Sequence, residues 1–485
     1  MNYKVIGKFI SRILFIEAIF MIPALLISIY DNEKPAVIGF LGAILLIMIL
    51  AFILYFICKK AKQRFFAKEG LVCVGLSWIV LSLLGCLPFY ISGEIPVFID
   101  ALFEMVSGFT TTGASILTNV EAMSRGLLYW RSFSHWLGGM GVLVFLLAIV
   151  PADGRSNRFT MHLLRAESPG PNVGKLTPRM RDTAKILYIL YIGLTVLNII
   201  FLLIGKMPVF EAFCTAFGTA GTGGFGVKNN SIAGYSPYLQ GVCTVFMLLF
   251  GVNFSCYYLL FLKRFKAVFK DGELRIYLGI VFASIAMITA NIFSLFGNVK
   301  DAFHHAAFTV SSIITTTGFS TEDFDLWPGF SKAILLILMM IGACAGSTGG
   351  GLKCGRLLIL IRSVRRNIRQ TLNPRKVEVI RNSGNVVDER IVSGVNGYFA
   401  AYILIVFISF LLISLDGQSI VTNLSGVVAC FNNIGPGFEL VGPTSSYALF
   451  GAFSKFILII DMLAGRLEIF PILILLSRNT WTSKR

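Results

Sequence analysis

The sequence contains few charged residues for its length. Only 14% of its 485 residues are Asp, Glu, Lys or Arg, whereas 56% are hydrophobic and the mean hydropathy is +0.78. Soluble globular domains carry about 25% charged residues. This composition therefore excludes an ordinary soluble fold and indicates an all-α polytopic membrane protein.

Patterns for metal binding, disulfides and nucleotide binding are also missing. The four histidines form no ligand cluster, and the nine cysteines include no Cys-x-x-Cys pair. The P-loop pattern is not satisfied, because Lys353 is followed by Cys354. Gly221, Gly223 and Gly226 match Gly-x-Gly-x-x-Gly, but a polar Lys-Asn-Asn run follows where a dinucleotide site needs an apolar helix. Since we find no catalytic constellation either, we predict a protein that is not an enzyme and holds no permanent cofactor.

The sequence contains several uncharged apolar runs that are long enough to cross a membrane. An uncharged run at residues 36–58 exceeds the roughly 20 residues that cross a bilayer core. The first run contains Glu17 and ends without a small-residue cleavage pattern, so we expect it to stay as a helix and not to be removed as a signal peptide. We predict ten spans, at residues 13–30, 36–58, 70–92, 132–152, 186–205, 238–262, 276–299, 333–352, 391–415 and 456–476.

Lys and Arg cluster in alternate loops. Dense basic segments lie at residues 59–68, 155–185, 263–275 and 353–390, whereas the intervening loops hold few basic residues. The positive-inside rule then places both termini in the cytoplasm, as an even number of spans requires. This distribution accounts for the net charge of +17 without nucleic acid as a partner.

A polar triplet followed by glycine recurs four times. Each copy closes an apolar segment of about 10 to 14 residues, at 101–109, 210–219, 302–314 and 420–431, a length that suits a re-entrant helix better than a span. Any one copy also fits a helical hairpin whose small residues allow close packing, but four copies at matching places favour an internal repeat. The copies are Thr110, Thr111, Thr112, Gly113; Ala220, Gly221, Thr222, Gly223; Thr315, Thr316, Thr317, Gly318; and Asn432, Asn433, Ile434, Gly435.

The repeat divides the chain into five units. We predict four tandem units of span, re-entrant helix and span around one pore, after an N-terminal two-helix hairpin. The hairpin covers residues 1–68, and the units cover residues 69–154, 155–264, 265–382 and 383–485.

These turns have the chemistry that a dehydrated cation needs. Glycine permits positive φ and close approach, rings of backbone carbonyls can replace a water shell, and helix C-termini pointing inward add negative potential. Threonine hydroxyls can add further oxygens. Acidic residues near the predicted outer ends either concentrate cations at the mouth or are solvated loop ends; they are Asp100, Glu104, Glu211, Asp301, Glu322, Asp323, Asp325, Asp416 and Glu439.

Three further motifs accompany the triplets: WLGGMGV at 136–142, LRAESPGP at 164–171 and GSTGGGLK at 346–353. With the N-terminal hairpin, they make the chain resemble the Trk/Ktr/HKT superfamily of potassium transporters, and most closely its TrkH family. The resemblance implies that the four triplets with their glycines form a filter for K⁺, the transported ion, and Gly113 in place of serine implies potassium preference. Because the turns lack the tyrosine of the channel signature TVGYG, a sodium-selective or weakly selective pathway and an ion-coupled symporter remain as alternatives.

A glycine-rich segment at residues 345–351 interrupts the eighth predicted span. Several glycines at one membrane depth break a helix, and the resemblance implies an intramembrane loop that obstructs the path under the filter. Arg466 lies in the last span, where a charge costs about 2.5 to 3.5 kcal/mol; the resemblance implies that it faces the pore. The alternatives are a flexible helix end and a structural ion pair with another span. The predicted gate comprises Gly346, Ser347, Thr348, Gly349, Gly350, Gly351 and Arg466.

The segment after the glycines predicts a basic amphipathic helix. Apolar residues at 361, 364, 368 and 372 alternate with arginines at 362, 365, 366 and 369. Such a helix suits an anionic lipid surface or a docking partner. The resemblance implies a bacterial inner-membrane homodimer with a cytosolic TrkA-like nucleotide-binding regulatory ring as its partner.

Overall fold

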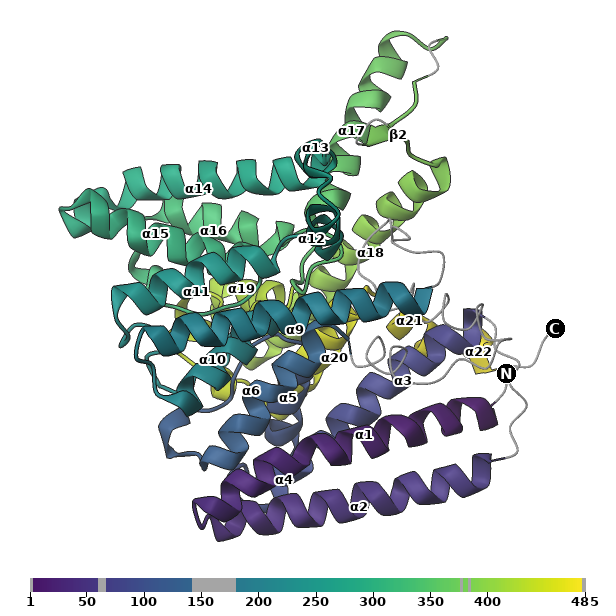
Figure 1. The fold of residues 1–485 in the computed structure, drawn as a ribbon. Helices are drawn as coiled ribbons and strands as arrows, with labels where there is room; N and C mark the ends of the chain where they lie inside the picture. Colours follow the sequence, from purple (N-terminus) through teal and green to yellow (C-terminus); the bar gives the residue numbers. More distant parts are fainter. Residues whose placement is uncertain (1–2, 60–66, 142–179, 376–377, 383–384, 482–485) are drawn as a thin grey trace.

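The structure is a computed structural model that describes residues 3–59, 67–141, 180–375, 378–382 and 385–481. Nearly all of these residues with regular structure are helical (Figure 1), which confirms the all-α prediction. In the described part of the chain, strands occur only as an antiparallel pair of two-residue segments, β1 (Arg381–Asn382) and β2 (Asn385–Val386).

The N-terminal hairpin consists of α1 (Tyr3–Tyr30) and α2 (Lys34–Cys58), which lie side by side at one edge of the bundle (Figure 1). Helix α1 also packs on α3 (Ala67–Gly85) and α6 (Arg125–Gly139), and α2 packs on α4 (Leu87–Ile91). Gly39 permits the second contact, because a Cβ there would lie 2.7 Å from the carbonyl oxygen of Pro88. The hairpin is therefore packed against the helices that precede and follow the first polar triplet.

Six of the ten predicted spans are confirmed as helices long and apolar enough to cross a membrane. They are α1, α2, α3 with α4, α9 (Met180–Ile204), α14 (Gly272–Phe296) and α18 (Glu389–Ile413). Their leucine, isoleucine and valine side chains bury one face in the bundle and leave the other exposed, as expected for helices that meet lipid. The predicted span at 132–152 runs into residues outside the described part.

Four short helices match the predicted re-entrant segments. They are α5 (Phe98–Phe109), α10 (Val209–Gly221), α15 (Val299–Ile314) and α19 (Ile420–Phe431). Each begins with an exposed apolar residue at the bundle surface and ends among fully buried ones. Their C-termini therefore lie inside the protein.

The helix that follows each short helix packs between it and the next one. Helix α6 contacts α5 and α10, and α11 (Pro237–Phe250) contacts α10 and α15. Helix α16 (Gly329–Ile341) contacts α15 and α19, and α20 (Ala452–Arg466) contacts α19 and α5. Because the last contact returns to the first short helix, the eight helices close a ring.

These four following helices all stop near the level of the short helices' C-termini. Two of the predicted spans, 238–262 and 456–476, are therefore wrong as continuous helices, and the predicted interruption of the span at 333–352 is confirmed. The span at 238–262 bends by 89° between α11 and α12 (Phe254–Phe261), that at 333–352 ends after α16, and that at 456–476 breaks between α20 and α21 (Phe470–Leu476). The last break has positive φ at Glu468 and Ile469, which an α-helix cannot accommodate.

The remaining elements are short or lie at the ends of the bundle. Helix α17 (Cys354–Leu372) projects away from the N-terminal hairpin (Figure 1), and α1 begins at the same end of the bundle at which α22 stops. The other elements are α13 (Phe265–Phe269), α22 (Arg478–Trp481) and the 3₁₀ turns η1 (Val120–Ala122), η2 (Phe324–Leu326), η3 (Ser414–Asp416), η4 (Glu439–Val441) and η5 (Tyr447–Leu449).

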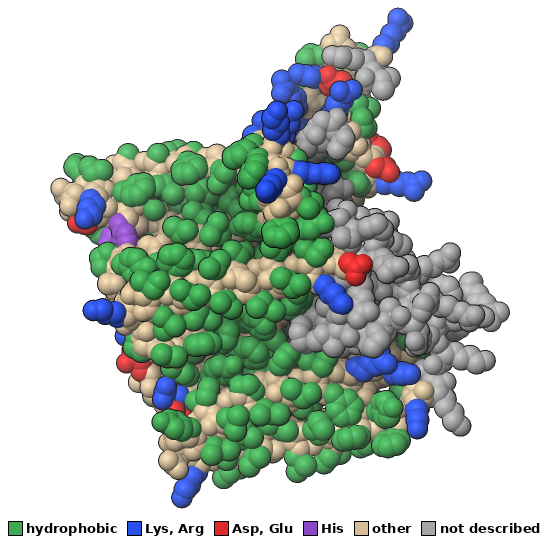
Figure 2. Space-filling view, in the orientation of Figure 1, with side chains coloured by type: hydrophobic (Ala, Val, Ile, Leu, Met, Phe, Trp, Pro, Cys, Tyr) green, Lys and Arg blue, Asp and Glu red, His purple; other side chains and the backbone are tan. Residues whose placement is uncertain are grey.

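Figure 2 shows hydrophobic side chains covering the helices between the two ends of the bundle, with Lys and Arg gathered at the ends and around α17. An exposed apolar surface of this extent in a chain of this composition is what a bilayer covers.

Candidate functional site

Each short helix ends in the same tight turn. The second residue of each turn and the glycine two positions later have positive φ, so that the backbone reverses twice within four residues. We name these segments turn 1 (110–113), turn 2 (221–224), turn 3 (315–318) and turn 4 (432–435). The φ values are 55° at Thr111, 53° at Thr222, 59° at Thr316 and 56° at Asn433, and 80° at Gly113, 76° at Gly224, 83° at Gly318 and 96° at Gly435.

Turn 2 lies one residue later than the predicted stretch 220–223. Ala220 belongs to the last turn of α10, and the glycine with positive φ is Gly224, not Gly223. The hydrogen bonds establish the equivalence: the third residue of each turn donates its N–H to the carbonyl five residues earlier, from Gly223 to Gly218 (2.9 Å) as from Thr317 to Ser312 (2.8 Å). Gly223 is therefore the counterpart of Thr317.

The four glycines close a ring of backbone contacts. A Cβ added to Gly113 would lie 2.0 Å from the carbonyl oxygen of Gly223 in turn 2. The same holds for Gly224 with Thr317 (1.9 Å), for Gly318 with Ile434 (2.1 Å) and for Gly435 with Thr112 (2.9 Å). Each glycine thus abuts the third carbonyl of the next turn, in cyclic order, and only a residue without a side chain fits there.

The threonine hydroxyls have two different environments. Those of Thr110 and Thr315 turn back to the helix, where they donate to the carbonyls of Val106 (2.7 Å) and Ser311 (2.6 Å). Among the described residues, the buried hydroxyl of Thr111 has no hydrogen-bond partner. A hydroxyl that donates its proton keeps oxygen lone pairs, so the role of the six threonines of turns 1 and 3 as oxygen ligands stays a prediction.

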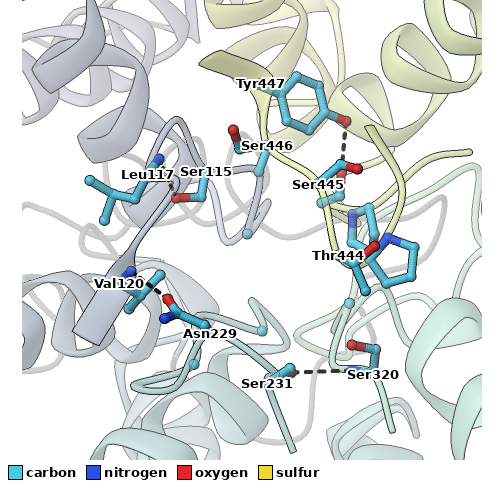
Figure 3. A pocket seen from close by; sticks show the side chains of 18 of the residues that line it. Ser115, Leu117, Val120, Asn229, Ser231, Ser320, Thr444, Ser445, Ser446 and Tyr447 are labelled. Carbon is cyan, nitrogen blue, oxygen red and sulfur yellow. Dashed lines mark hydrogen bonds between the residues drawn. The ribbon is translucent and has the colours of Figure 1, made fainter. Parts of the chain in front are cut away.

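A cavity of about 430 Å³ opens on the outer side of the ring. The four turn glycines line its floor, and segments that follow all four turns form its walls. Figure 3 shows Ser115, Asn229, Ser320 and Tyr447 around it, one from each of these segments. Hydrogen bonds join neighbouring walls, for example from the N–H of Val120 to Asn229 (2.7 Å).

Several of the predicted outer acids are engaged in ion pairs. Glu104 is wholly buried and pairs with Arg131 at 2.5 Å, so its assignment to the mouth is wrong. Asp100 pairs with Lys455 at 2.7 Å. These carboxylates are neutralised by their partners, which weakens their attraction for an approaching cation.

A non-helical segment lies directly beneath the ring. We name it the glycine loop (342–353); it begins three residues before the predicted interruption at 345–351. The N–H of Gly350 donates to the hydroxyl of Thr316 at 2.7 Å, and a Cβ on Gly350 would lie 2.3 Å from the carbonyl oxygen of Asn432. The glycine loop therefore touches the inner ends of turns 3 and 4.

Arg466 reaches the glycine loop from α20. Its guanidinium donates to the carbonyl oxygens of Thr348 (2.9 Å), Gly138 (2.5 Å) and Gly139 (2.7 Å). The three carbonyls replace water around the charge and join the glycine loop to the end of α6. The guanidinium is thus bound by backbone oxygens of two other segments.

Four further charged residues lie in or beside the glycine loop, and the sequence did not single out Glu273 or Arg356 among them. Glu273 at the start of α14 accepts hydrogen bonds from the N–H groups of Ala345 (2.6 Å) and Gly355 (2.8 Å). Lys353 donates to the carbonyl of Gly349, and Arg356 pairs with Glu468 in the break after α20.

The missed register of turn 2 had a signal in the sequence. Phenylalanine directly follows both Gly224 and Gly318, so alignment on the Gly-Phe pair would have placed turn 2 correctly. Glu273 had no such signal, because its partners lie more than 70 residues away in the chain.

Comparison with known proteins gives a consistent result along the whole chain. Residues 39–482 match the profile of the TrkH family, described as a cation transport protein. The chain is 34% identical to the Trk system potassium uptake protein TrkH of Salmonella typhimurium and 33% identical to that of Escherichia coli K12; in each pair 99% of this chain and 100% of the relative are covered.

A solved structure shares the fold. The crystal structure of the potassium transporter TrkH from Vibrio parahaemolyticus superposes with a TM-score of 0.87 at 30% identity, over 99% of this chain and 100% of that one. The motif at 164–171 lies outside the described residues, but the family profile spans it. By profile, relatives and fold alike, this chain belongs to the TrkH family of cation transport proteins.

Proposed function

We propose that this chain conducts potassium ions across a membrane through the axis that turns 1 to 4 enclose. The observation that carries the proposal is the cyclic contact of the four turn glycines with the carbonyls of the next turn. Backbone carbonyls in such a ring can replace the hydration shell of an ion. The four short helices point their C-termini at the ring, and their dipoles favour a cation there.

The repeat supports the same proposal. Four units of span, re-entrant helix and interrupted helix would place the turns symmetrically around one pore, with boundaries near residues 69, 155, 265 and 383. Non-helical backbone at membrane depth is tolerated where it is buried in protein or lines a watery cavity, and the turns and the cavity above them meet that condition.

Ion flux through the purified protein in liposomes tests the function. We expect potassium and rubidium to enter down their gradients at least about ten times faster than sodium and lithium, as a carbonyl ring of fixed geometry favours the larger ions. Sodium flux equal to potassium flux would support a weakly selective pathway. Flux that requires an imposed proton or sodium gradient would support a symporter. A well-folded protein without any flux would contradict ion transport and would favour the alternative that the protein is a membrane-bound enzyme.

We further propose that the glycine loop and Arg466 form a gate. The loop lies across the inner end of the ring, in contact with Thr316 and near Asn432, and Arg466 adds a positive charge at that point. A cation leaving the ring would meet both the loop and the charge. Opening must move the loop away from turns 3 and 4.

Glu273 gives this gate a test of its own. Its carboxylate accepts hydrogen bonds from Ala345 inside the loop and from Gly355 at the start of α17, and hydrogen bonds to a charged group contribute about 1.5 to 3 kcal/mol each. We expect Glu273→Ala to loosen the loop and to raise potassium flux about three- to tenfold in the liposome assay. Glu273→Gln keeps an acceptor oxygen in the same place and should change flux less. A Gln variant as active as the Ala variant would show that the two hydrogen bonds do not hold the gate.

The setting of the protein follows from charge and surface. We propose a bacterial inner-membrane location with both termini in the cytoplasm, supported by the basic segments at the end of the bundle that carries α13 and α17. A homodimer and a cytosolic TrkA-like nucleotide-binding ring are proposed as partners. The exposed apolar face of α17, which includes Ile361, Val364 and Ile368, supports contact with such a ring or with lipid.

A further inference from the structure

Glu104 on α5 and Arg131 on α6 form an ion pair that is sealed inside the protein beside turn 1. The side chain of Arg131 is 3% exposed and that of Glu104 is 0% exposed. Removing two charges from water is costly unless each is paired and fully hydrogen-bonded. Both groups make further contacts that apolar side chains of the same size could not make.

The carboxylate holds the segment that leaves turn 1. Glu104 accepts a hydrogen bond from the hydroxyl of Ser115 (3.0 Å) and another from the N–H of Ile116 (3.0 Å). These residues follow Gly113 by two and three positions. The path of the backbone on one side of the ring thus depends on this carboxylate.

The guanidinium holds the segment that leaves turn 2. Arg131 donates from Nη1 to the carbonyl oxygen of Gly226 at 3.0 Å, and its Cζ lies 3.5 Å from the centroid of the Phe225 ring. Both residues directly follow Gly224. The ion pair therefore ties the exits of turns 1 and 2 to each other.

Turns 3 and 4 are tied differently, by uncharged groups. Ser312 donates its hydroxyl to the carbonyl of Phe319 (2.6 Å), and Tyr447 donates its hydroxyl to the carbonyl of Gly435 (2.7 Å). Nine residues before each turn glycine, where the first unit has Glu104, the other units have Thr215, Thr309 and Gly426. The charged tie is therefore specific to the side of the ring between turns 1 and 2.

Arg131 also lines the outer cavity. A positive charge beside the path of a cation repels it unless a nearby carboxylate compensates, and Glu104 is in position to do so. The pair thus places the planar guanidinium of Arg131, with its several N–H donors, near the proposed ion path, while Glu104 keeps the local net charge near zero.

We propose that Glu104 and Arg131 are positioning residues that set the spacing of turns 1 and 2 and thereby the preference of the ring for potassium over sodium. The inference rests on the proposed function. A carbonyl ring distinguishes two ions only as far as its oxygens are held in place, and the pair is the buried, charged contact among those that join the exits of turns 1 and 2.

The test compares potassium and sodium flux in liposomes for the wild type, Glu104→Gln, Arg131→Gln and the double variant. We expect each single change to lower the ratio of potassium to sodium flux about fivefold or more, and the double change to lower it no further than the more severe single one, because both remove one shared interaction. The proposal would be overturned if the single variants kept the flux ratio of the wild type. It would also be overturned if the loss in the double variant equalled the product of the two single losses.

Two additions keep the test decisive. Ser115→Ala removes one hydroxyl that donates a hydrogen bond to Glu104, and it should lower the flux ratio in the same direction but less. Where flux is too low to give a ratio, the extra thermal stabilisation of the solubilised protein by potassium over sodium gives the same comparison. We expect that difference between the salts to shrink in each variant, and a difference equal to that of the wild type overturns the proposal.

Asp31→Asn is the matched control. It breaks an ion pair of 3.0 Å with Arg125, which lies on the same helix as Arg131 but away from the four turns. Its flux ratio should equal that of the wild type. A wild type without cation flux contradicts the proposed function itself, whereas a selective wild type whose Glu104 and Arg131 variants remain selective contradicts only the role of this pair.

Discussion

Replacing Arg466 with alanine should raise potassium flux through this protein about ten- to a hundredfold. The guanidinium makes hydrogen bonds with three carbonyl oxygens, one on the glycine loop and two at the end of α6. Hydrogen bonds to a charged group contribute about 1.5 to 3 kcal/mol each, and about 1.4 kcal/mol corresponds to a tenfold change in an equilibrium. Losing even one or two of them should shift the gate strongly towards its open form.

The measurement is the initial rate of potassium uptake into liposomes that contain equal amounts of folded protein. Arg466→Lys separates the two contributions of the side chain, because lysine keeps the charge but lacks the planar fork that reaches several carbonyls. If the hydrogen bonds close the gate, the lysine variant should also leak. If the charge alone blocks cations, the lysine variant should resemble the wild type. Unchanged or reduced flux in a folded Arg466→Ala variant would contradict both roles.

Replacing Gly224 with alanine should abolish selective potassium flux. The residue has φ +76°, and an added Cβ would lie 1.9 Å from the carbonyl oxygen of Thr317, far inside any permitted contact. The backbone of turn 2 or turn 3 would have to move, and the oxygens of the ring would move with it. We expect potassium flux to fall below about a tenth of the wild-type rate, or sodium flux to rise to match it, since either follows from a displaced carbonyl.

Gly241→Ala serves as the comparison, since this glycine on α11 in the same unit has no atom within 4 Å of an added Cβ. It should leave flux and selectivity unchanged. Gly223→Ala is not a suitable control for Gly224→Ala, because its added Cβ would lie 2.3 Å from the ring of His135. A Gly224→Ala protein that remains potassium-selective would argue against the ring as the filter.

Much of the fold could be predicted because it depends on local sequence. The four short helices were located within a few residues of their observed bounds, since an apolar segment too short to span and closed by glycine allows few other structures. The six straight spans were likewise visible as uncharged runs of sufficient length. The break after α16 was expected from its glycines, although it begins earlier, at Gly342.

The breaks after α11 and α20 were not expected. The first break has only Gly251 and Asn253 among apolar residues, and the second has only Arg466 and Glu468. The segment after α11 is fixed by partners far away in the chain. The N–H of Phe254 donates to the carbonyl of Gly346, and the N–H of Cys344 donates to that of Gly251. Backbone groups that leave a helix inside the bundle need such partners, and no pattern within 20 residues could show them.

The sequence by itself determined that this is a polytopic helical protein, that four short helices end in polar turns with glycine, and which family it resembles. These features follow from hydropathy, helix length and the freedom of glycine, all of which are local. Only the tertiary structure decided the cyclic order of the turns and the burial of Glu104 against Arg131. Each of these depends on which neighbouring carbonyl or charge a residue meets across the ring, and such contacts join residues about 30 to 300 positions apart in the chain.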